Sequence, residues 1–267
     1  MLARVATMDP APSSSGREEM NGHGLYWELH GQRQRPTVVL LHHGLGSVRA
    51  WQRQIPAFTT AGWRVLAYDR WGYGRSDPRP AFAPDFLLND AVEAVRLFDA
   101  LEIERACLVG HSDGGSIALL IAASHPERIQ RLVTVAAHIY LEQVTGQGVR
   151  GIAQSAQVPP LKNALEREHG AKAQAMVQAW TSRWLDPQMA SLSMVTELPK
   201  IACPALVIQG ELDEHATPQH ARDIAASVRQ GKLWLIPGVH HMVPHEIPEE
   251  FNRRVLEFLS PARGRER

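Results

Sequence analysis

The sequence has little of what marks secreted, membrane or nucleic-acid-binding proteins. Two cysteines in 267 residues are too few for a disulfide framework, which favours a reducing compartment. The 28 basic and 28 acidic residues balance, so no basic field attracts phosphate backbones or anionic lipid. The longest apolar run, residues 117–123, is far shorter than the roughly 20 residues that span a bilayer. The N-terminus lacks the pattern of a signal peptide. We therefore expect a cytoplasmic protein that binds neither nucleic acid nor membrane.

The composition nevertheless supports a large folded core. Apolar residues make up 44% of the chain and charged residues 21%, which excludes a disordered protein. Surface scaling for a chain of this mass predicts that about three quarters of the unfolded surface becomes buried on folding. Single α/β domains often reach this length. One domain is therefore expected, and the sequence makes no prediction of its oligomeric state.

Short apolar, β-branched runs alternate with helix-like segments along the chain. Each run has the length and composition of a strand that is buried on both faces. Apolar residues recur every three or four positions at 88–101 and 251–259, as on the buried side of a helix. This alternation predicts an α/β fold, with a mostly parallel twisted sheet and helices on both faces. The expected strands are residues 38–41, 65–68, 106–109, 132–135, 205–208 and 233–236.

Residues 139–197 interrupt this alternation, because they carry no strand pattern. An expected helix there has one apolar side, formed by Met176, Val177, Trp180 and Trp184. The insertion leaves the carboxyl end of a strand, where open α/β sheets bind ligands, so we expect a helical lid over a pocket. Trp180 and Trp184 then either contact the substrate or form the core of the lid.

The domain boundaries follow from these patterns. Residues 21–138 and 198–260 are expected to form the sheet domain, and residues 139–197 the lid. Residues 1–20 and 261–267 are rich in proline, serine, glycine or charged residues and have little apolar surface to bury. We expect these two segments to be flexible tails.

The sharpest motif is G-H-S-D-G-G at residues 110–115, between an expected strand and an apolar helix. A turn this tight forces its central residue into strained backbone geometry, and Gly110 and Gly114 leave the space that the turn needs. The hydroxyl of Ser112 is then held at the carboxyl edge of the sheet, beside the N–H groups of the helix start. The motif predicts a nucleophilic serine.

A serine hydroxyl is a weak nucleophile near neutral pH and needs a base to accept its proton. The chain has 13 histidines, most of them ordinary surface or core residues. His240 and His241 differ because they follow the last expected strand and precede the last expected helix. This position places them at the same sheet edge as Ser112. The base is therefore expected in this pair.

The base in turn needs a carboxylate that orients it. Asp213 follows the strand at 205–208, and Glu211 and Glu214 compete with it on charge alone. The alternative role for Asp213 is to cap the helix that follows Pro218. The chain order serine, acid, histidine is the order expected for this sheet topology.

The negative charge that develops on a substrate oxygen needs two backbone N–H donors. Asp113 directly follows the nucleophile, so its N–H is one of them. The loop at residues 42–46 (H-H-G-L-G) follows the first expected strand, and its glycines allow close approach, which makes Leu45 N–H the expected second donor. The Asp113 side chain has two open roles, which are pairing with a cationic substrate group and bonding to nearby loop backbone.

Together these motifs resemble those of lidded serine hydrolases of the α/β-hydrolase fold family. The resemblance runs from the strand before His42 to Leu259 and so covers most of the chain. It implies that Ser112 is the nucleophile, Asp213 the acid and His241, the second histidine of its pair, the base. The matching stretches are L-L-H-H-G-L-G (40–46), Y-D-R-W-G-Y-G-R-S (68–76), G-H-S-D-G-G (110–115), C-P-A-L-V-I-Q-G-E-L-D (203–213) and I-P-G-V-H-H-M (236–242).

Two details narrow the activity that the resemblance implies. A serine at position 112 argues against relatives with an aspartate nucleophile, such as haloalkane dehalogenases and epoxide hydrolases. The S-D-G-G motif and the sequence from Trp184 onward resemble valacyclovir-hydrolase-like and carboxylesterase-like enzymes. The implied activity is hydrolysis of a small carboxylic ester or lactone through an acyl-enzyme.

Two other functions remain open beside it. A carbon–carbon bond hydrolase of ring-cleavage products would use the same three residues, and a ligand receptor of this fold would use them to capture a signal. The expected partner is a small-molecule substrate. We expect no cofactor, and no metal, because no Cys/His cluster has the spacing of metal ligands.

Overall fold

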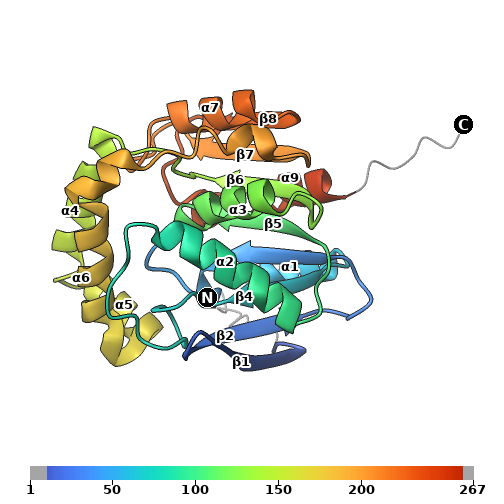
Figure 1. Ribbon diagram of the computed structural model, residues 1–267, viewed down its shortest axis with the longest axis horizontal. Coiled ribbons are helices and arrows are strands. Elements are labelled where there is room, and N and C mark those ends of the chain that lie inside the picture. The colour runs from blue at the N-terminus through green and yellow to red at the C-terminus, as the bar shows by residue number, and fades with distance from the viewer. Residues whose placement is uncertain (1–10, 261–267) are drawn as a thin grey trace, which may run out of the picture.

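An eight-stranded sheet runs through residues 11–260, the part of the chain that the computed structural model describes (Figure 1). The strand order is β1-β2-β4-β3-β5-β6-β7-β8. Strands β3 to β8 are parallel to one another, whereas β2 is antiparallel to both β1 and β4. The strands are β1 (Ser14–Met20), β2 (His23–His30), β3 (Thr37–Leu41), β4 (Arg64–Tyr68), β5 (Ala106–His111), β6 (Ile129–Val135), β7 (Ala205–Gly210) and β8 (Gly231–Ile236).

Alternate side chains of each central strand enter two separate cores, one on either face of the sheet. In β3, Val39 and Leu41 join one core while Val38 and Leu40 join the other. Helices α2 (Phe86–Ala100), α3 (Asp113–Ser124) and α7 (Gln219–Ser227) cover the first face. Helices α1 (Ile55–Thr60), α8 (Val243–Glu246) and α9 (Pro248–Leu259) cover the second. The expected fold class, a mostly parallel sheet with helices on both faces, is confirmed.

The prediction of a flexible tail over residues 1–20 is wrong for residues 14–20, which form strand β1. All seven residues of β1 pair with β2, from Ser14 opposite Leu29 to Met20 opposite His23. The residues are polar because an edge strand is exposed, and its order comes from main-chain pairing rather than from apolar burial. Residues 1–10 and the predicted tail at 261–267 lie outside the described residues.

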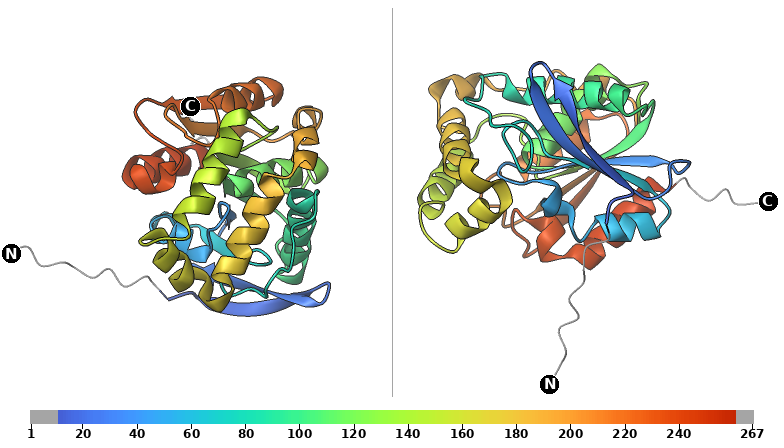
Figure 2. Two further views of the ribbon diagram at one scale, coloured as in Figure 1. Left: turned by 90° about the vertical axis from the view of Figure 1, so that its left-hand side faces the viewer. Right: turned by 90° about the horizontal axis from the view of Figure 1, so that it is seen from below.

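The segment between β6 and β7 is helical and covers the sheet edge at which the parallel strands end (Figures 1 and 2). It contains α4 (Gln143–Ser155), α5 (Leu161–His169) and α6 (Ala173–Trp184). Short 3₁₀ helices η2 (Gly170–Lys172), η3 (Pro187–Ser191) and η4 (Leu198–Lys200) connect these helices or lead to β7, and η1 (Val48–Trp51) follows β3. None of the described helices has the length and apolarity needed to cross a membrane.

Nine histidines are held neutral by burial, which lowers the pKa of each below its ordinary value. The pKa falls to about 3 for His43 and His138 and to about 4 for His169. Protonating such a ring in the folded protein would cost part of the hydration of the new charge, whereas the unfolded chain takes up the proton in water. The nine are His23, His42, His43, His111, His138, His169, His215, His220 and His245.

We predict that the free energy of unfolding falls as the pH is lowered from 7 to 5. Below the unfolded histidine pKa of 6.5 the unfolded chain binds more protons than the folded one, so stability is full above that pH and is lost toward the folded pKa values. A shift to about 4 makes the loss due to His169 alone about 2 kcal/mol at pH 5. Urea unfolding at pH 5, 6, 7 and 8 measures the slope. His169→Gln should reduce it, and a flat profile would contradict the prediction.

Candidate active site

Ser112 stands in a strained turn between β5 and α3. Its backbone has φ 55° and ψ −120°, a conformation that costs energy for any residue other than glycine. The turn closes because the flanking residues lack side chains. A Cβ on Gly110 would lie 2.1 Å from Gly114 O, and a Cβ on Gly114 would lie 2.1 Å from Leu41 O. The predicted strained turn at Ser112 is therefore present, and it packs the start of α3 closely against the end of β3.

Asp213 and His241 meet at the same edge of the sheet, in the loops after β7 and β8. The Nδ1 atom of His241 is 2.9 Å from Asp213 Oδ1 and 3.0 Å from Oδ2. The backbone N–H of His215 donates to Asp213 Oδ1 at 2.8 Å, and Gln209 Nε2 donates to Oδ2 at 3.2 Å. Of the three acidic residues considered from the sequence, Asp213 is the one that contacts the ring of His241.

The carboxylate of Asp213 stays charged although it is buried. Burial acts to raise its pKa, but His241 and the backbone N–H of His215 outweigh this, so the pKa lies below its usual value. The charged form accepts the Nδ1–H of His241, which leaves Nε2 of that ring as the atom able to take a proton.

Residues that the sequence analysis did not select hold His241 in place. His111 Nε2 donates to the backbone carbonyl of His241 at 2.9 Å, and Glu214 accepts the backbone N–H of His241 at 3.2 Å. His111 comes directly before Ser112 and Glu214 directly after Asp213, so adjacency in the motifs was the available signal. His241 is thus fixed through its backbone as well as its side chain.

Ser112 and His241 line one cavity of about 310 Å³ beneath the helical segment. Leu45, Asp113, Trp180 and Trp184 line it as well, and its outer wall is mostly apolar. That wall comes from α4 and α5, where Val149, Ile152, Leu161 and Leu165 are apolar and Thr145 is polar. The sequence left open whether Trp180 and Trp184 face a pocket or form the core of the helical segment. Both are buried in that core, and both also reach the cavity.

The two expected N–H donors border this cavity. Asp113 is the first residue of α3, so its N–H has no acceptor within the helix. Leu45 has φ 63°, in the left-handed region. The carbonyl of the Gly44–Leu45 peptide accepts His43 Nδ1–H at 2.5 Å. The C=O and N–H of a trans peptide point in opposite directions. The bond from His43 to Gly44 O therefore fixes the direction in which the Leu45 N–H points.

The side chain of Asp113 is not bonded to the backbone of a nearby loop, which was one of the two roles considered from the sequence. It accepts the indole N–H of Trp180 at 2.8 Å and lies 3.6 Å from a guanidinium nitrogen of Arg70. Bonding to loop backbone is therefore wrong as the structural role of this side chain. Burial raises its pKa, and the positive charge of Arg70 acts against that rise. The arginine in turn is paired with Asp90 at 2.8 Å, itself bound by Arg79 at 2.6 Å.

Within residues 11–260, no group of three His, Cys, Asp or Glu side chains is arranged to hold a metal ion. Several polar side chains around the cavity are bonded to one another or to backbone, whereas Thr145 Oγ1, His138 Nδ1 and Trp184 Nε1 are buried without a hydrogen-bond partner among the described residues. Arg70 is a further residue that the sequence analysis did not select, although it follows β4 at the carboxyl edge of the sheet, where site residues collect.

Comparison with known proteins places the chain in a family. The family model described as alpha/beta hydrolase fold matches residues 36–248. The chain is 30% identical to serine hydrolase BPHL of Mus musculus, covering 96% of this chain and 89% of that protein. It is 31% identical to the putative carbamate hydrolase RutD of Caulobacter sp. (strain K31), covering 89% and 96%. A solved hydrolase from Pseudomonas aeruginosa is 23% identical, with a TM-score of 0.77 and coverage of 93% and 99%.

The family match spans the turn at Ser112 and the loops that carry Asp213 and His241, and the relatives match over nearly their whole length. The glycine-flanked serine, the bonded acid and histidine and the sheet topology all agree with that match. The chain belongs to the α/β-hydrolase fold family of serine hydrolases, and it is a hydrolase.

Proposed function

We propose that the protein hydrolyses small carboxylic esters or lactones, with Ser112 as nucleophile, His241 as base and Asp213 as the acid that orients the base. One observation carries the proposal. The ring of His241 is bonded to Asp213 through Nδ1 and borders the same cavity as Ser112, so its Nε2 is the atom available to the serine hydroxyl.

The reaction proceeds in two halves. His241 Nε2 takes the proton of Ser112 Oγ as that oxygen attacks the ester carbonyl carbon, and the tetrahedral intermediate collapses to an acyl-enzyme. The protonated histidine passes its proton to the departing alcohol oxygen. A water molecule, deprotonated by the same histidine, then attacks the acyl carbon and releases the carboxylic acid, restoring the serine. A lactone follows the same steps, with its alcohol remaining attached to the acid.

Asp113 N–H and Leu45 N–H stabilise the oxyanion of each tetrahedral intermediate. Both are backbone donors, so they are already oriented when the charge forms and need no rearrangement. The start of α3 adds the positive end of a helix dipole at the same place. In a cavity screened from water by the helical segment, each such donor contributes about 3 kcal/mol to lowering the barrier.

The size and lining of the cavity support a small substrate. Its volume of about 310 Å³ is at the lower end of small-molecule sites, which typically range over roughly 300–1,000 Å³. The apolar wall from α4 and α5 suits a short acyl or alcohol group. The name of one relative, a serine hydrolase, supports a serine nucleophile. The name of another, a putative carbamate hydrolase, supports attack on a carbonyl carbon that bears a heteroatom leaving group.

We also propose that the carboxylate of Asp113 contacts a cationic group of the substrate, such as the ammonium of an amino-acid ester. The side chain borders the cavity, and a carboxylate has about four acceptor positions, so its contact with Trp180 leaves room for another donor. Burial raises the pKa of this carboxyl group, and the guanidinium of Arg70, 3.6 Å away, acts against that rise and favours the charged form.

Ser112→Ala should lower kcat for ester hydrolysis by four to six orders of magnitude, about 5–8 kcal/mol of barrier, while the fold survives. The alanine removes the attacking oxygen and leaves the backbone donors in place. Initial rates on p-nitrophenyl esters from C2 to C12 measure the effect. Ser124→Ala, at the exposed end of α3, is the matched control and should keep wild-type rates.

Retention of most esterase activity by Ser112→Ala would refute the nucleophile. The substrate series should also include a lactone and a vinylogous diketo acid. Selective turnover of the diketo acid with little ester hydrolysis would replace the ester proposal by carbon–carbon bond cleavage.

Asp113→Asn should reduce kcat/KM for amino-acid esters by roughly 10- to 100-fold, because a charge-assisted hydrogen bond to the substrate ammonium is lost. Plain esters of the same acyl size should lose much less, since the backbone N–H at position 113 is unchanged. Matched pairs of amino-acid and plain esters provide the measurement. An equal fall for both kinds of ester would show that the carboxylate supports the site without recognising a cation.

A further inference from the structure

The loop that carries the Leu45 donor, residues 42–47, is held by hydrogen bonds to its carbonyl groups, from side chains and from one backbone N–H. His43 O accepts Gly46 N–H at 3.1 Å and a guanidinium N–H of Arg70 at 3.2 Å. Gly44 O accepts the ring of His43. These contacts all come from the sheet domain. The carbonyl of Leu45 itself has a different partner, and that partner belongs to the helical segment.

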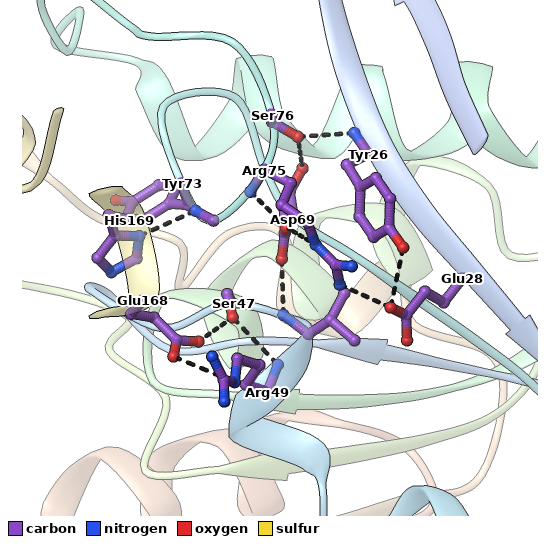
Figure 3. A network of polar contacts seen from close by, with 12 residues as sticks. Tyr26, Glu28, Ser47, Arg49, Asp69, Tyr73, Arg75, Ser76, Glu168 and His169 are labelled. Atoms are coloured by element: carbon purple, nitrogen blue, oxygen red, sulfur yellow. Dashed lines mark hydrogen bonds and ion pairs between the residues drawn. The ribbon is translucent and has the colours of Figure 1, made fainter. Parts of the chain in front are cut away.

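His169, the last residue of α5, donates Nε2–H to Leu45 O at 2.9 Å. The other ring nitrogen, Nδ1, accepts the backbone N–H of Gly74 at 2.9 Å. An acceptor at Nδ1 requires the proton of a neutral ring to sit on Nε2, so the two contacts together select the tautomer that bonds Leu45. The side chain is buried against Tyr73, and burial lowers its pKa to about 4, so the ring is neutral at physiological pH (Figure 3).

The neighbouring residue strengthens this attachment. Glu168 accepts the hydroxyl of Ser47, and Ser47 Oγ in turn accepts Arg49 N–H at 3.0 Å at the start of η1 (Figure 3). Glu168 also lies 3.8 Å from the guanidinium of Arg49. Two consecutive residues of α5 therefore hold both ends of the 45–47 segment.

A third contact joins the helical segment to the sheet domain without touching this loop. Lys172, in η2, donates to the carbonyl of Tyr73 at 3.1 Å and to that of Ser76. It anchors the segment to the turn at 69–76, the same turn that Asp69 holds through Arg75 N–H at 2.7 Å. A variant of Lys172 would therefore weaken the attachment of the helical segment without removing a contact to the donor loop.

We propose that His169 is a positioning residue for the oxyanion site: its bond to Leu45 O fixes the peptide after the donor and so aims the Leu45 N–H at the reacting oxygen. The inference rests on the proposed function, because it assigns Leu45 to oxyanion stabilisation. It means that the helical segment contributes to the chemical step as well as covering the cavity. A displacement of α5 would weaken oxyanion stabilisation even with Ser112, His241 and Asp213 undisturbed.

Two substitutions of His169 separate its contacts. His169→Gln places an amide N–H about where Nε2 stands and can still donate to Leu45 O, whereas His169→Asn offers an acceptor near Nδ1 for Gly74 but cannot reach Leu45. We expect His169→Asn to lower kcat roughly 10- to 100-fold with little change in KM, as for a misaimed transition-state donor. His169→Gln should stay within about threefold of wild type, since the bond to Leu45 persists. Lys172→Met, which loses only the anchoring contacts, should keep the wild-type kcat.

Inhibition by a trifluoromethyl ketone distinguishes positioning from general destabilisation. Such a ketone forms a tetrahedral adduct whose oxyanion occupies the donor site, so its Ki should rise in His169→Asn by the same factor by which kcat/KM falls. Equal rates for the Asn and Gln variants, or an unchanged Ki with a raised KM, would overturn the proposal.

Amide hydrogen exchange of the peptide covering residues 43–47 gives a readout that needs no turnover. Exchange should be faster in His169→Asn and unchanged in Lys172→Met. If the wild-type protein hydrolysed no ester or lactone, the proposed function would fail, and the exchange comparison would still decide whether His169 holds the loop. Unchanged exchange in His169→Asn would overturn the positioning role even in an active enzyme.

Discussion

The close packing of α3 on the end of β3 is the contact on which the site depends. At Gly114 the helix lies so near Leu41 that only a hydrogen atom fits between them, and the obstacle is backbone, which cannot move aside as a side chain can. This contact brings the start of α3 beside the loop that follows β3. The N–H groups of Asp113 and Leu45 therefore border one cavity with Ser112. The strain at Ser112 is maintained because β5 is buried throughout and α3 is buried over its first seven residues, from Asp113 to Leu119.

A second close backbone contact brings together the loops that carry Asp213 and His241. A Cβ on Gly210 would lie 2.2 Å from the carbonyl of Val239, so the loops after β7 and β8 pack directly on each other. Backbone hydrogen bonds extend the pairing of these strands into the loops, with Leu212 N–H donating to Val239 O at 3.0 Å. The short distance between Asp213 and His241 thus follows from the pairing of β7 with β8.

Charge inside the site is balanced locally. Arg70 and Arg79 stand beside Asp90 and Asp113, two charges of each sign in a buried cluster. Such a cluster contributes little net stability, but loss of one member leaves an uncompensated buried charge. Asp113 therefore does not create a wide negative field around the cavity. The proposed selection of a cation would therefore depend on direct contact with the carboxylate, which the indole of Trp180 holds in place.

Local sequence alone determined the six parallel strands and the nucleophile turn, because short apolar runs and glycine spacing act over a few residues. Only the tertiary structure made a strand of residues 14–20, whose polar side chains are ordered by pairing with β2. It also turned α2 so that Leu88 and Val92, on the apolar side expected from the sequence, are 48% and 42% exposed. His169 reaches Leu45 across 124 residues of sequence. No local pattern encodes such a contact, because the folding of the helical segment over the sheet edge creates it.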